Sequence, residues 1–368
     1  MKIKTITCHD VYNYGASLQA YALQQYLISK GHSVEIIDYK PDYICRKYNF
    51  WHVYASNKLA RICIRNFILR FIYCLIYAPV RYRTWQRIFA FNSFTKKNLR
   101  LTRRYKNLEE LKIFPPEADC YIAGSDQIWN TNLPNGRDNA FFLDFGSENT
   151  KRISYAASFG VREIEDVERI SLLLKKFDAV SVRELSGLDI LSKLNVPGSQ
   201  VLDPVYLLDK SQWITLMKAS KVVEKEPYVL VYDIFRKDPR MKEYSVECSK
   251  KMNLKLVAVN DSQILPYAKN IKTAGPVEFI ALIKNAKYLI SNSFHATSFA
   301  LIFHVPFIVL FNGNNSSRME DLLKSVGLSR CFNPSKICID EIEYDWVSID
   351  DKLKKLRLSS DEFLRSAL

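Results

Sequence analysis

The chain has 368 residues, of which 48% are hydrophobic and 25% charged, and this composition suits a globular protein with two full cores. Its net charge is +14, and its eight cysteines form no CxxC pair, which argues against a metal site and for reduced thiols in a cytoplasmic protein. No run of about 20 uncharged apolar residues occurs, and Met1 leads straight into a strand-like run, so we expect neither a membrane-spanning helix nor a signal peptide.

The chain opens with a βαβ pattern. It predicts a strand, a helix and a second strand over residues 2–8, 18–29 and 33–38, and Gly31 ends the helix. The loop that contains Asn13, Tyr14 and Ser17 then follows the carboxyl end of the first strand, where parallel sheets bind ligands. These three residues either line a site or make the turn and cap the helix.

The positive charge comes from a single segment. Residues 43–108 contain 15 Lys and Arg, 15 aromatic residues and no Asp or Glu, so the rest of the chain sums to 14 − 15 = −1. Residues 57–97 have a helical pattern, and we predict a basic, aromatic helical insertion in the first domain. An apolar run at 71–80 is flanked by four arginines, namely Arg65, Arg70, Arg81 and Arg83.

Three interpretations of this insertion remain open. In the first, residues 57–106 contact an anionic membrane surface, because apolar aromatics bracketed by arginines suit the membrane interface. Alternatively, the apolar face packs on the domain and the arginines face water. Nucleic-acid binding is the third interpretation, but no recognised motif supports it, and we expect no nucleic-acid partner.

A third buried strand over 118–123 runs into a loop with the sequence GSDQIWN. Asp126 and Gln127 offer directional hydrogen bonds and Trp129 offers a flat face, so the loop suits a sugar acceptor. In the alternative interpretation the loop stabilises itself through an Asp cap and a buried Trp. Further strands are predicted over 152–158, 177–182 and 200–203. Arg183 follows one of them, where it either faces the cleft and holds a carboxylate or phosphate or pairs with Glu184 or another surface acid.

A second set of strands follows a charged linker over 218–226. The strands are predicted over 228–232, 254–259, 288–290 and 307–310, with helices over 241–252, 276–285 and 296–303, and more helix over 318–326 and 348–366. The pattern predicts an α/β fold of two Rossmann-like parallel-sheet domains, 1–208 and 209–368, with a ligand cleft between them.

His295 lies at the turn between a predicted strand and a predicted helix in the second domain. A helix start favours an anion, and an imidazole there can exchange protons near neutral pH. His295 is therefore the leading candidate for a catalytic residue. The alternative is a histidine that only caps or packs against the helix.

Several segments together resemble the polysaccharide pyruvyl transferase family. They are YNYGASLQAYALQQYL, GSDQIWN, YAASFG, SVRE, DPVYLL and SNSFHATSFALIFHVPFI, spread over nearly the whole chain in one order. The resemblance implies a GT-B-like fold and transfer of pyruvyl from phosphoenolpyruvate, as co-substrate and without a further cofactor or metal, to two hydroxyls of a sugar. The product is a cyclic ketal.

The resemblance also implies roles for individual residues. His295 matches the catalytic histidine and is assigned as general acid and base, and Arg183 matches an arginine that binds the donor. Ser293 and Phe294 belong to the donor turn, but some family members carry an arginine where this chain has Ser293. We expect Arg318 to supply the missing cation, although no spacing rule places it there.

The acceptor implied by these features is a lipid-linked capsular or exopolysaccharide precursor at the inner face of the cytoplasmic membrane. Two other functions remain open at this stage. One is a GT-B glycosyltransferase that uses a nucleotide sugar, which releases nucleotide instead of phosphate. The other is a non-catalytic, membrane-peripheral protein that binds glycans, in which loss of His295 has no effect.

Overall fold

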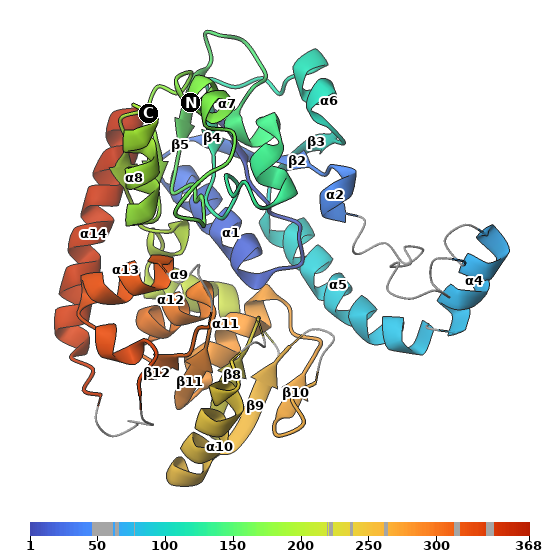
Figure 1. Ribbon diagram of the computed structural model, residues 1–368, viewed down its shortest axis with the longest axis vertical. Coiled ribbons are helices and arrows are strands. Elements are labelled where there is room, and N and C mark those ends of the chain that lie inside the picture. The colour runs from blue at the N-terminus through green and yellow to red at the C-terminus, as the bar shows by residue number, and fades with distance from the viewer. Residues whose placement is uncertain are drawn as a thin grey trace.

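The computed structural model describes most of the chain, and it builds two α/β domains (Figure 1). The described residues are 1–45, 62, 66–76, 78–218, 220, 224–235, 238–260, 264–312, 317–335 and 342–368. Arg65 lies outside them, as do the side chains of Arg81 and Arg83. The predicted contact of these three arginines with an anionic membrane surface stays a prediction.

The first domain is built on a parallel sheet in the order β3-β2-β1-β4-β5. Its strands are β1 (Lys2–Ile6), β2 (Ser33–Tyr39), β3 (Leu101–Tyr105), β4 (Cys120–Ala123) and β5 (Lys151–Ser154). Two short strands extend it through isolated bridges, namely β6 (Ser181–Val182) and β7 (Ser199–Gln200). Helices α1 (Tyr14–Ser29), α6 (Leu108–Ile113), α7 (Val167–Leu174), α8 (Leu185–Lys193) and α9 (Lys210–Met217) connect and follow these strands.

The second domain repeats this topology with the strand order β10-β9-β8-β11-β12. Its strands are β8 (Tyr228–Tyr232), β9 (Lys255–Val259), β10 (Lys269–Ile271), β11 (Tyr288–Ser291) and β12 (Phe307–Val309). Its helices are α10 (Arg240–Met252), α11 (Pro276–Asn285), α12 (Phe294–Phe303), α13 (Ser317–Val326) and α14 (Trp346–Ala367). Two parallel five-stranded sheets in the described part of the chain confirm the predicted fold class.

The sequence analysis missed the edge strands β3 and β10. The β3 sequence, LTRRY, lies inside the basic segment, and its two arginines are exposed while Tyr105 is buried. Edge strands of this kind are short and charged, so they lack the continuous apolar run that identifies a buried parallel strand. The predicted strands over 152–158 and 177–182 were also too long, because β5 ends at Ser154 and β6 begins at Ser181.

The two domains share an apolar interface. The Tyr14 ring of α1 stacks on Phe279 of α11 with 4.3 Å between ring centroids, and its hydroxyl donates to the Ala274 carbonyl at 3.0 Å. On the far side of the interface, Trp213 of α9 packs edge-on against Phe299 of α12 at 4.9 Å. These buried aromatic contacts fix how the helix starts of the two domains face one another.

Helix α14 begins beside the second domain and ends against the first (Figure 1). Its Ser360 hydroxyl accepts from the Leu202 N–H at 2.9 Å, and Asp361 pairs with Lys30 of α1 at 2.8 Å. Lys151 of β5 donates to the carbonyl of Ala367, near the end of this helix, at 3.1 Å. The predicted boundary between residues 208 and 209 stays a prediction, because α14 contacts both domains.

The basic segment forms an arm that leaves the body of the protein. Helix α2 (Asp42–Cys45) lies at its start, and the helices of the arm are α4 (Phe67–Ile76) and α5 (Ala78–Asn98). Figure 1 shows α5 running away from the first domain, with α4 at its far end. Among the described residues, no helix is both long and apolar enough to cross a membrane.

Removing the Ser360 hydroxyl tests how firmly α14 is docked. Because Ser360 is fully buried and its loss leaves the half-buried Leu202 N–H without this partner, Ser360→Ala is expected to lower the free energy of unfolding by about 1–3 kcal/mol. Urea unfolding followed by circular dichroism measures the change. Ser366→Ala is the matched control, because Ser366 is exposed on the same helix and bonds only within it, and no more than about 0.5 kcal/mol is expected there. Equal effects of the two changes would contradict the docking.

Candidate functional site

The turn before α12 is fixed by its own polar side chains. The Ser293 hydroxyl caps the helix by accepting from the Ala296 N–H at 3.3 Å, and the Ser291 hydroxyl donates to the Tyr232 carbonyl at 2.6 Å. The Asn292 amide donates to Asp233 at 2.6 Å and accepts from the Ile234 N–H at 2.8 Å. The polar turn therefore ties the end of β11 to the end of β8 and sets the direction in which α12 starts.

His295 is held at the interface of the two domains. Its residue exposure is 8%, and the imidazole lies directly against Gly15 near the start of α1. A Cβ atom at Gly15 would lie 2.0 Å from His295 Nδ1, so only a glycine leaves room for the ring. The starts of α1 and α12 thus meet at this imidazole. The sequence predicted its place at the start of α12 but not its contact with α1.

The buried carboxylate of Asp203 faces the other ring nitrogen. His295 Nε2 lies 3.5 Å from Asp203 Oδ2, and the same carboxylate accepts from the Ser125 hydroxyl and the Val205 N–H, each at 3.1 Å. Arg183 Nη1 also donates to it. Burial by itself raises the pKa of Asp203, but His295 and Arg183 outweigh this effect and hold that pKa well below its usual range. Asp203 is therefore an ionised carboxylate placed to orient the imidazole.

Arg183 connects Asp203 to Phe294 at the start of α12. Its guanidinium lies over the Phe294 ring, 4.6 Å from the centroid, and its Nη2 lies 3.8 Å from Asp126 Oδ1. Glu184 does not pair with Arg183. Its carboxylate instead accepts from the Ser158 hydroxyl at 2.9 Å and from the Gly160 N–H at 3.1 Å. Of the two alternatives for Arg183, the structure thus places it in the interdomain cluster.

Arg318 joins the same cluster from the start of α13. The hydrogen-bonding neighbours of Gln127 assign its amide oxygen to the side facing Arg318. In this orientation the Gln127 oxygen accepts from Arg318 Nη2 at 2.8 Å and from Nη1 at 3.2 Å. Burial and the nearby charge of Arg183 lower the pKa of Arg318 to about 10. Two guanidinium groups brought this close repel each other, so an anion between them would be favoured.

Several buried donors in this cluster have no hydrogen-bond partner among the described residues. They are Nε and Nη2 of Arg183, Nε of Arg318 and Nε2 of His295. Buried donors of this kind are rare because each costs about 1–3 kcal/mol when it is unsatisfied. A cavity of about 80 Å³ borders the cluster, and Arg183, Asp203, Phe294 and Arg318 are among the residues that line it. The arrangement fits a small anion with several oxygen atoms.

A larger pocket of about 550 Å³ opens between the carboxyl ends of the two sheets. Asn13 and Tyr14 line it from the first domain, together with Arg87 of α5, and Asp233 and Asn260 line it from the second. The Asn13 side chain also caps α1 by accepting from the Ala16 N–H at 3.3 Å, so the two interpretations of this residue hold together. Tyr14 lines this pocket, and the next residue, Gly15, lies against the His295 imidazole.

The other predicted acceptor residues lie elsewhere. Asp126 and Gln127 contact the arginines of the cluster, as described above, and neither lines the larger pocket. Ser17 is buried, with its hydroxyl 3.5 Å from the His9 carbonyl. Trp129 is fully buried, stacks on Phe142 and donates to the Phe141 carbonyl at 3.0 Å. The position of Trp129 does not support its predicted contact with a sugar, because both ring faces are covered by the core.

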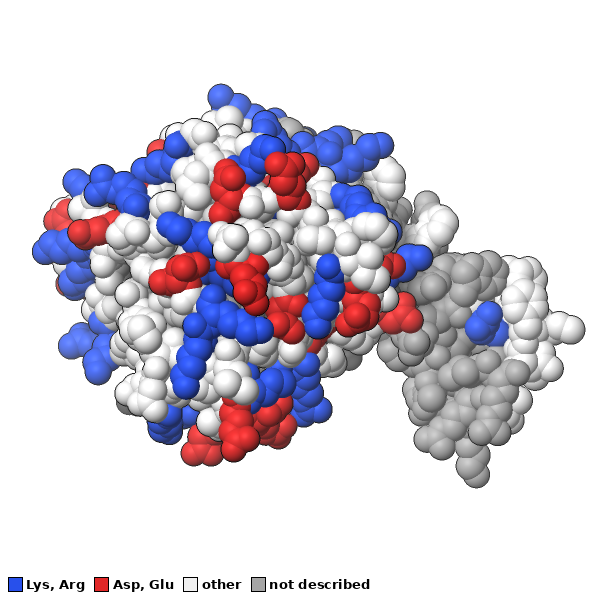
Figure 2. All heavy atoms as spheres, turned by 90° about the horizontal axis from the view of Figure 1, so that it is seen from above, with Lys and Arg blue, Asp and Glu red and all other residues white. Residues whose placement is uncertain are grey.

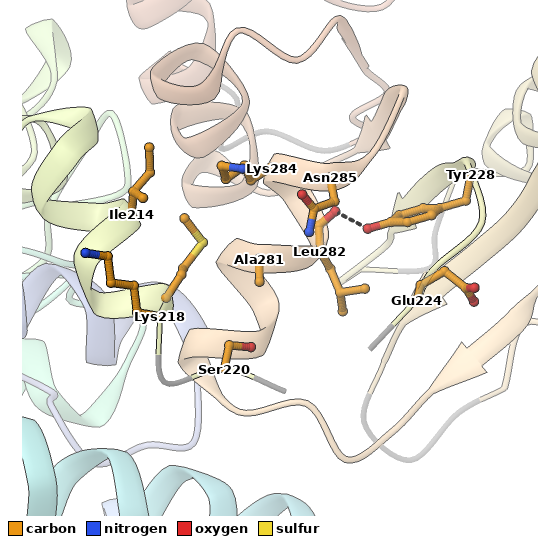
Figure 3. A pocket seen from close by; sticks show the side chains of 10 residues that line it. Ile214, Lys218, Ser220, Glu224, Tyr228, Ala281, Leu282, Lys284 and Asn285 are labelled. Atoms are coloured by element: carbon orange, nitrogen blue, oxygen red, sulfur yellow. Dashed lines mark hydrogen bonds between the residues drawn. The ribbon is translucent and has the colours of Figure 1, made fainter. Parts of the chain in front are cut away.

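A further pocket, of about 260 Å³, lies at the opposite edge of the second sheet (Figure 3). Tyr228 begins β8 and Asn285 ends α11, so this pocket is at the amino ends of the strands. The Tyr228 hydroxyl donates to the Leu282 carbonyl at 2.7 Å, the dashed line in the figure. Ligands of such sheets bind at the carboxyl ends, and the pocket is lined by none of the residues of the His295 cluster.

Sequence reasoning missed two residues of the cluster, Asp203 and Gly15. Asp203 carried a detectable signal, because it ends an apolar stretch and precedes Pro204, a position that caps a short helix at a strand end. Gly15 carried none beyond being a glycine in a loop, since its contact with His295 joins residues 280 positions apart, 295 − 15.

Comparison with solved structures finds similar folds at low identity. One is a UDP-GlcNAc 2-epimerase from Methanocaldococcus jannaschii in complex with UDP-GlcNAc and UDP, with 14% identity, 97% of this chain and 100% of that chain covered, and a TM-score of 0.49. Another is ADP-heptose lps heptosyltransferase II from E. coli, with 10% identity, 98% and 100% covered, and a TM-score of 0.41. At this level of similarity, neither substrates nor site residues transfer to this chain.

Comparison with curated proteins finds no match. A family model described as polysaccharide pyruvyl transferase matches residues 13–314. This span contains the helix start at Asn13, the cluster around Asp203 and the turn that carries His295. The chain therefore belongs to the polysaccharide pyruvyl transferase family.

Proposed function

We propose that the protein transfers pyruvyl from phosphoenolpyruvate to two hydroxyls of a sugar and forms a cyclic ketal. The observation that carries the proposal is the set of unsatisfied buried donors on Arg183 and Arg318, which both line one small cavity. His295 Nε2, a third unsatisfied donor, lies 3.5 Å from Asp203, which lines the same cavity. Phosphoenolpyruvate has a phosphate and a carboxylate, and guanidinium groups bind both bidentately. Family membership favours this reaction over transfer from a nucleotide sugar.

The donor occupies the smaller cavity in this proposal. Arg183 and Arg318 hold its oxyanions, and the start of α12 behind Ser293 adds N–H groups and a partial positive charge. The Phe294 ring stacks under the Arg183 guanidinium in a cation–π contact that holds it in place. Arg318 thereby supplies the cation that some relatives carry in the place of Ser293.

His295 moves the protons. Oriented by Asp203, the imidazole protonates C3 of the donor, which makes C2 electrophilic. One sugar hydroxyl attacks C2, the bond from C2 to the phosphate oxygen breaks and phosphate leaves, and the second hydroxyl then attacks C2 and closes the ring. The two hydroxyls release two protons while C3 gains one, so the imidazole accepts one of them and is ready for the next cycle, and the other leaves with phosphate or solvent.

The sugar acceptor occupies the larger pocket between the sheets. Tyr12 and Tyr43 line it with aromatic side chains, and Asn13 and Asn135 line it with amide groups, a combination that suits a sugar. A lipid-linked oligosaccharide precursor at the cytoplasmic face of the membrane is the proposed acceptor, since Arg87 connects this pocket to the helices of the basic arm.

His295→Ala is expected to reduce turnover by about 10²–10⁴-fold, because the reaction then lacks its general acid and base. Phosphate release from phosphoenolpyruvate in the presence of a panel of lipid-linked oligosaccharides measures the change. His304→Asn is the matched control, because His304 ends the same helix with a left-handed backbone that Asn tolerates, and it pairs with Asp350 away from the cluster.

Gly15→Ala tests the same imidazole from the opposite side. Its new Cβ would overlap His295 Nδ1, so the ring must move, and turnover is expected to fall by at least about tenfold with the fold retained. Near-normal phosphate release in both His295→Ala and Gly15→Ala would exclude the assigned role. Release of a nucleotide from a nucleotide sugar would instead favour a glycosyltransferase.

Arg318→Gln is expected to weaken phosphoenolpyruvate binding by about 10–100-fold, the loss of charge-assisted hydrogen bonds worth about 1.5–3 kcal/mol. Isothermal titration calorimetry with phosphoenolpyruvate alone measures this effect without an acceptor. Arg330→Gln, an exposed position in the same domain, is the control and should leave the affinity unchanged. Unchanged affinity in Arg318→Gln would remove this residue from the donor site.

A further inference from the structure

Helix α4 presents an apolar surface that the body of the protein does not cover. Six large apolar side chains in its ten residues are each at least 42% exposed, namely Phe67, Ile68, Phe71, Ile72, Leu75 and Ile76. Scattered exposed apolar residues are normal, but a contiguous patch of this kind marks an interaction site.

The exposed face is defined by the helical period. Arg70 and Tyr73 are half-buried and Cys74 is buried, and these three positions fall on one side of the helix at spacings of three and four. The six exposed apolar side chains occupy roughly the opposite half of the circumference, at about 100° per residue. The arrangement is that of an amphipathic helix whose apolar half points away from the protein.

The segment that contains this face is basic in composition. The segment 43–108 carries 15 Lys and Arg and no acid, whereas the rest of the chain has a net charge of −1. Figure 2 shows white side chains on the described edge of the projecting arm, next to a single blue side chain, while blue and red are interspersed on the body. A second copy of this arm would bring two strongly positive segments together, which like-charge repulsion opposes. An acidic, apolar surface is the complementary partner.

From these observations we propose that α4 lies in the interface of a membrane rich in anionic phospholipids. A ten-residue helix is about 15 Å long, too short to cross a bilayer of about 30 Å but long enough to lie in its surface. Its apolar half enters the acyl boundary, and the arginines and lysines of the arm contact phosphate groups, each at about 1 kcal/mol. This inference goes beyond the proposed function, because lipid binding requires neither donor nor acceptor.

The arm also relates the membrane to the larger pocket. Arg87 of α5 lines that pocket and donates to the Tyr12 carbonyl at 2.9 Å, and Phe91 of the same helix packs on Tyr14 at 5.1 Å. Arg87 is nine residues beyond Ala78, or about 14 Å along the helix axis. A bilayer that holds α4 would therefore lie close to the mouth of the pocket.

Flotation of the full chain with vesicles tests the proposal. Binding is expected to vesicles of phosphatidylcholine with phosphatidylglycerol, to be weak with phosphatidylcholine alone, and to decrease with added salt. The triple variant Ile68→Gln, Ile72→Gln, Leu75→Gln removes the centre of the apolar face and should lower partitioning by at least about tenfold. Circular dichroism and thermal unfolding confirm that this variant folds.

The matched control changes three exposed apolar residues of the body, Leu172→Gln, Val347→Gln and Leu358→Gln, and should bind vesicles as the unchanged chain does. Equal loss in both triple variants, or no binding of the unchanged chain to anionic vesicles, would overturn the proposal. A dimer that the α4 variant alone converts to a monomer, without vesicle binding, would assign the face to a second copy. Because no phosphoenolpyruvate is present, failure here leaves the proposed reaction untouched.

Discussion

The site is organised around the buried carboxylate of Asp203. Ionised carboxylates are expensive to bury unless hydrogen bonds and opposite charges replace water, and here Ser125, Val205, Arg183 and His295 do so. These partners come from four separate segments of the chain and from both domains. The carboxylate is stable only when all of them are in position, so the same contacts that stabilise the charge fix the place of the imidazole relative to the arginine.

This constraint divides the interdomain region into two parts. On one side of His295 lies the small cavity with the two arginines, and on the other, beyond Gly15, lies the larger pocket between the sheets. A small anionic donor and a larger sugar acceptor would then approach one imidazole from different directions. Such a separation would suit the proposed reaction, in which protons move between the two substrates, because His295 is in contact with Asp203 of the small cavity and with Gly15, next to Tyr14 of the larger pocket.

The interface that holds the two domains is apolar and aromatic at its centre. Tyr14 stacked on Phe279 and Trp213 packed on Phe299 set the distance between α1 and the helices of the second domain. Helix α14 adds a second connection through Ser360 and Asp361. Both connections leave the carboxyl ends of the strands open toward the pocket, which is where parallel sheets bind ligands.

The sequence by itself determined the two α/β domains, the interior strands and the strand-to-helix turn of His295. Each depends on local features, namely continuous apolar runs, helical periodicity and polar turn residues, which are readable without knowledge of distant contacts. The edge strands β3 and β10 were not predicted, because each is short and polar and its sequence therefore resembles that of a loop.

Only the tertiary structure decided which residues meet at the site. Asp203 and Gly15 are distant in sequence from His295, and Asp126 and Gln127 turned toward the arginines while Trp129 went into the core. The sequence of a small polar-aromatic loop is compatible with both a sugar site and a self-stabilised turn. The two are distinguished by whether the aromatic side chain is exposed or buried. Burial depends on how sheets and helices pack together, which no local pattern contains.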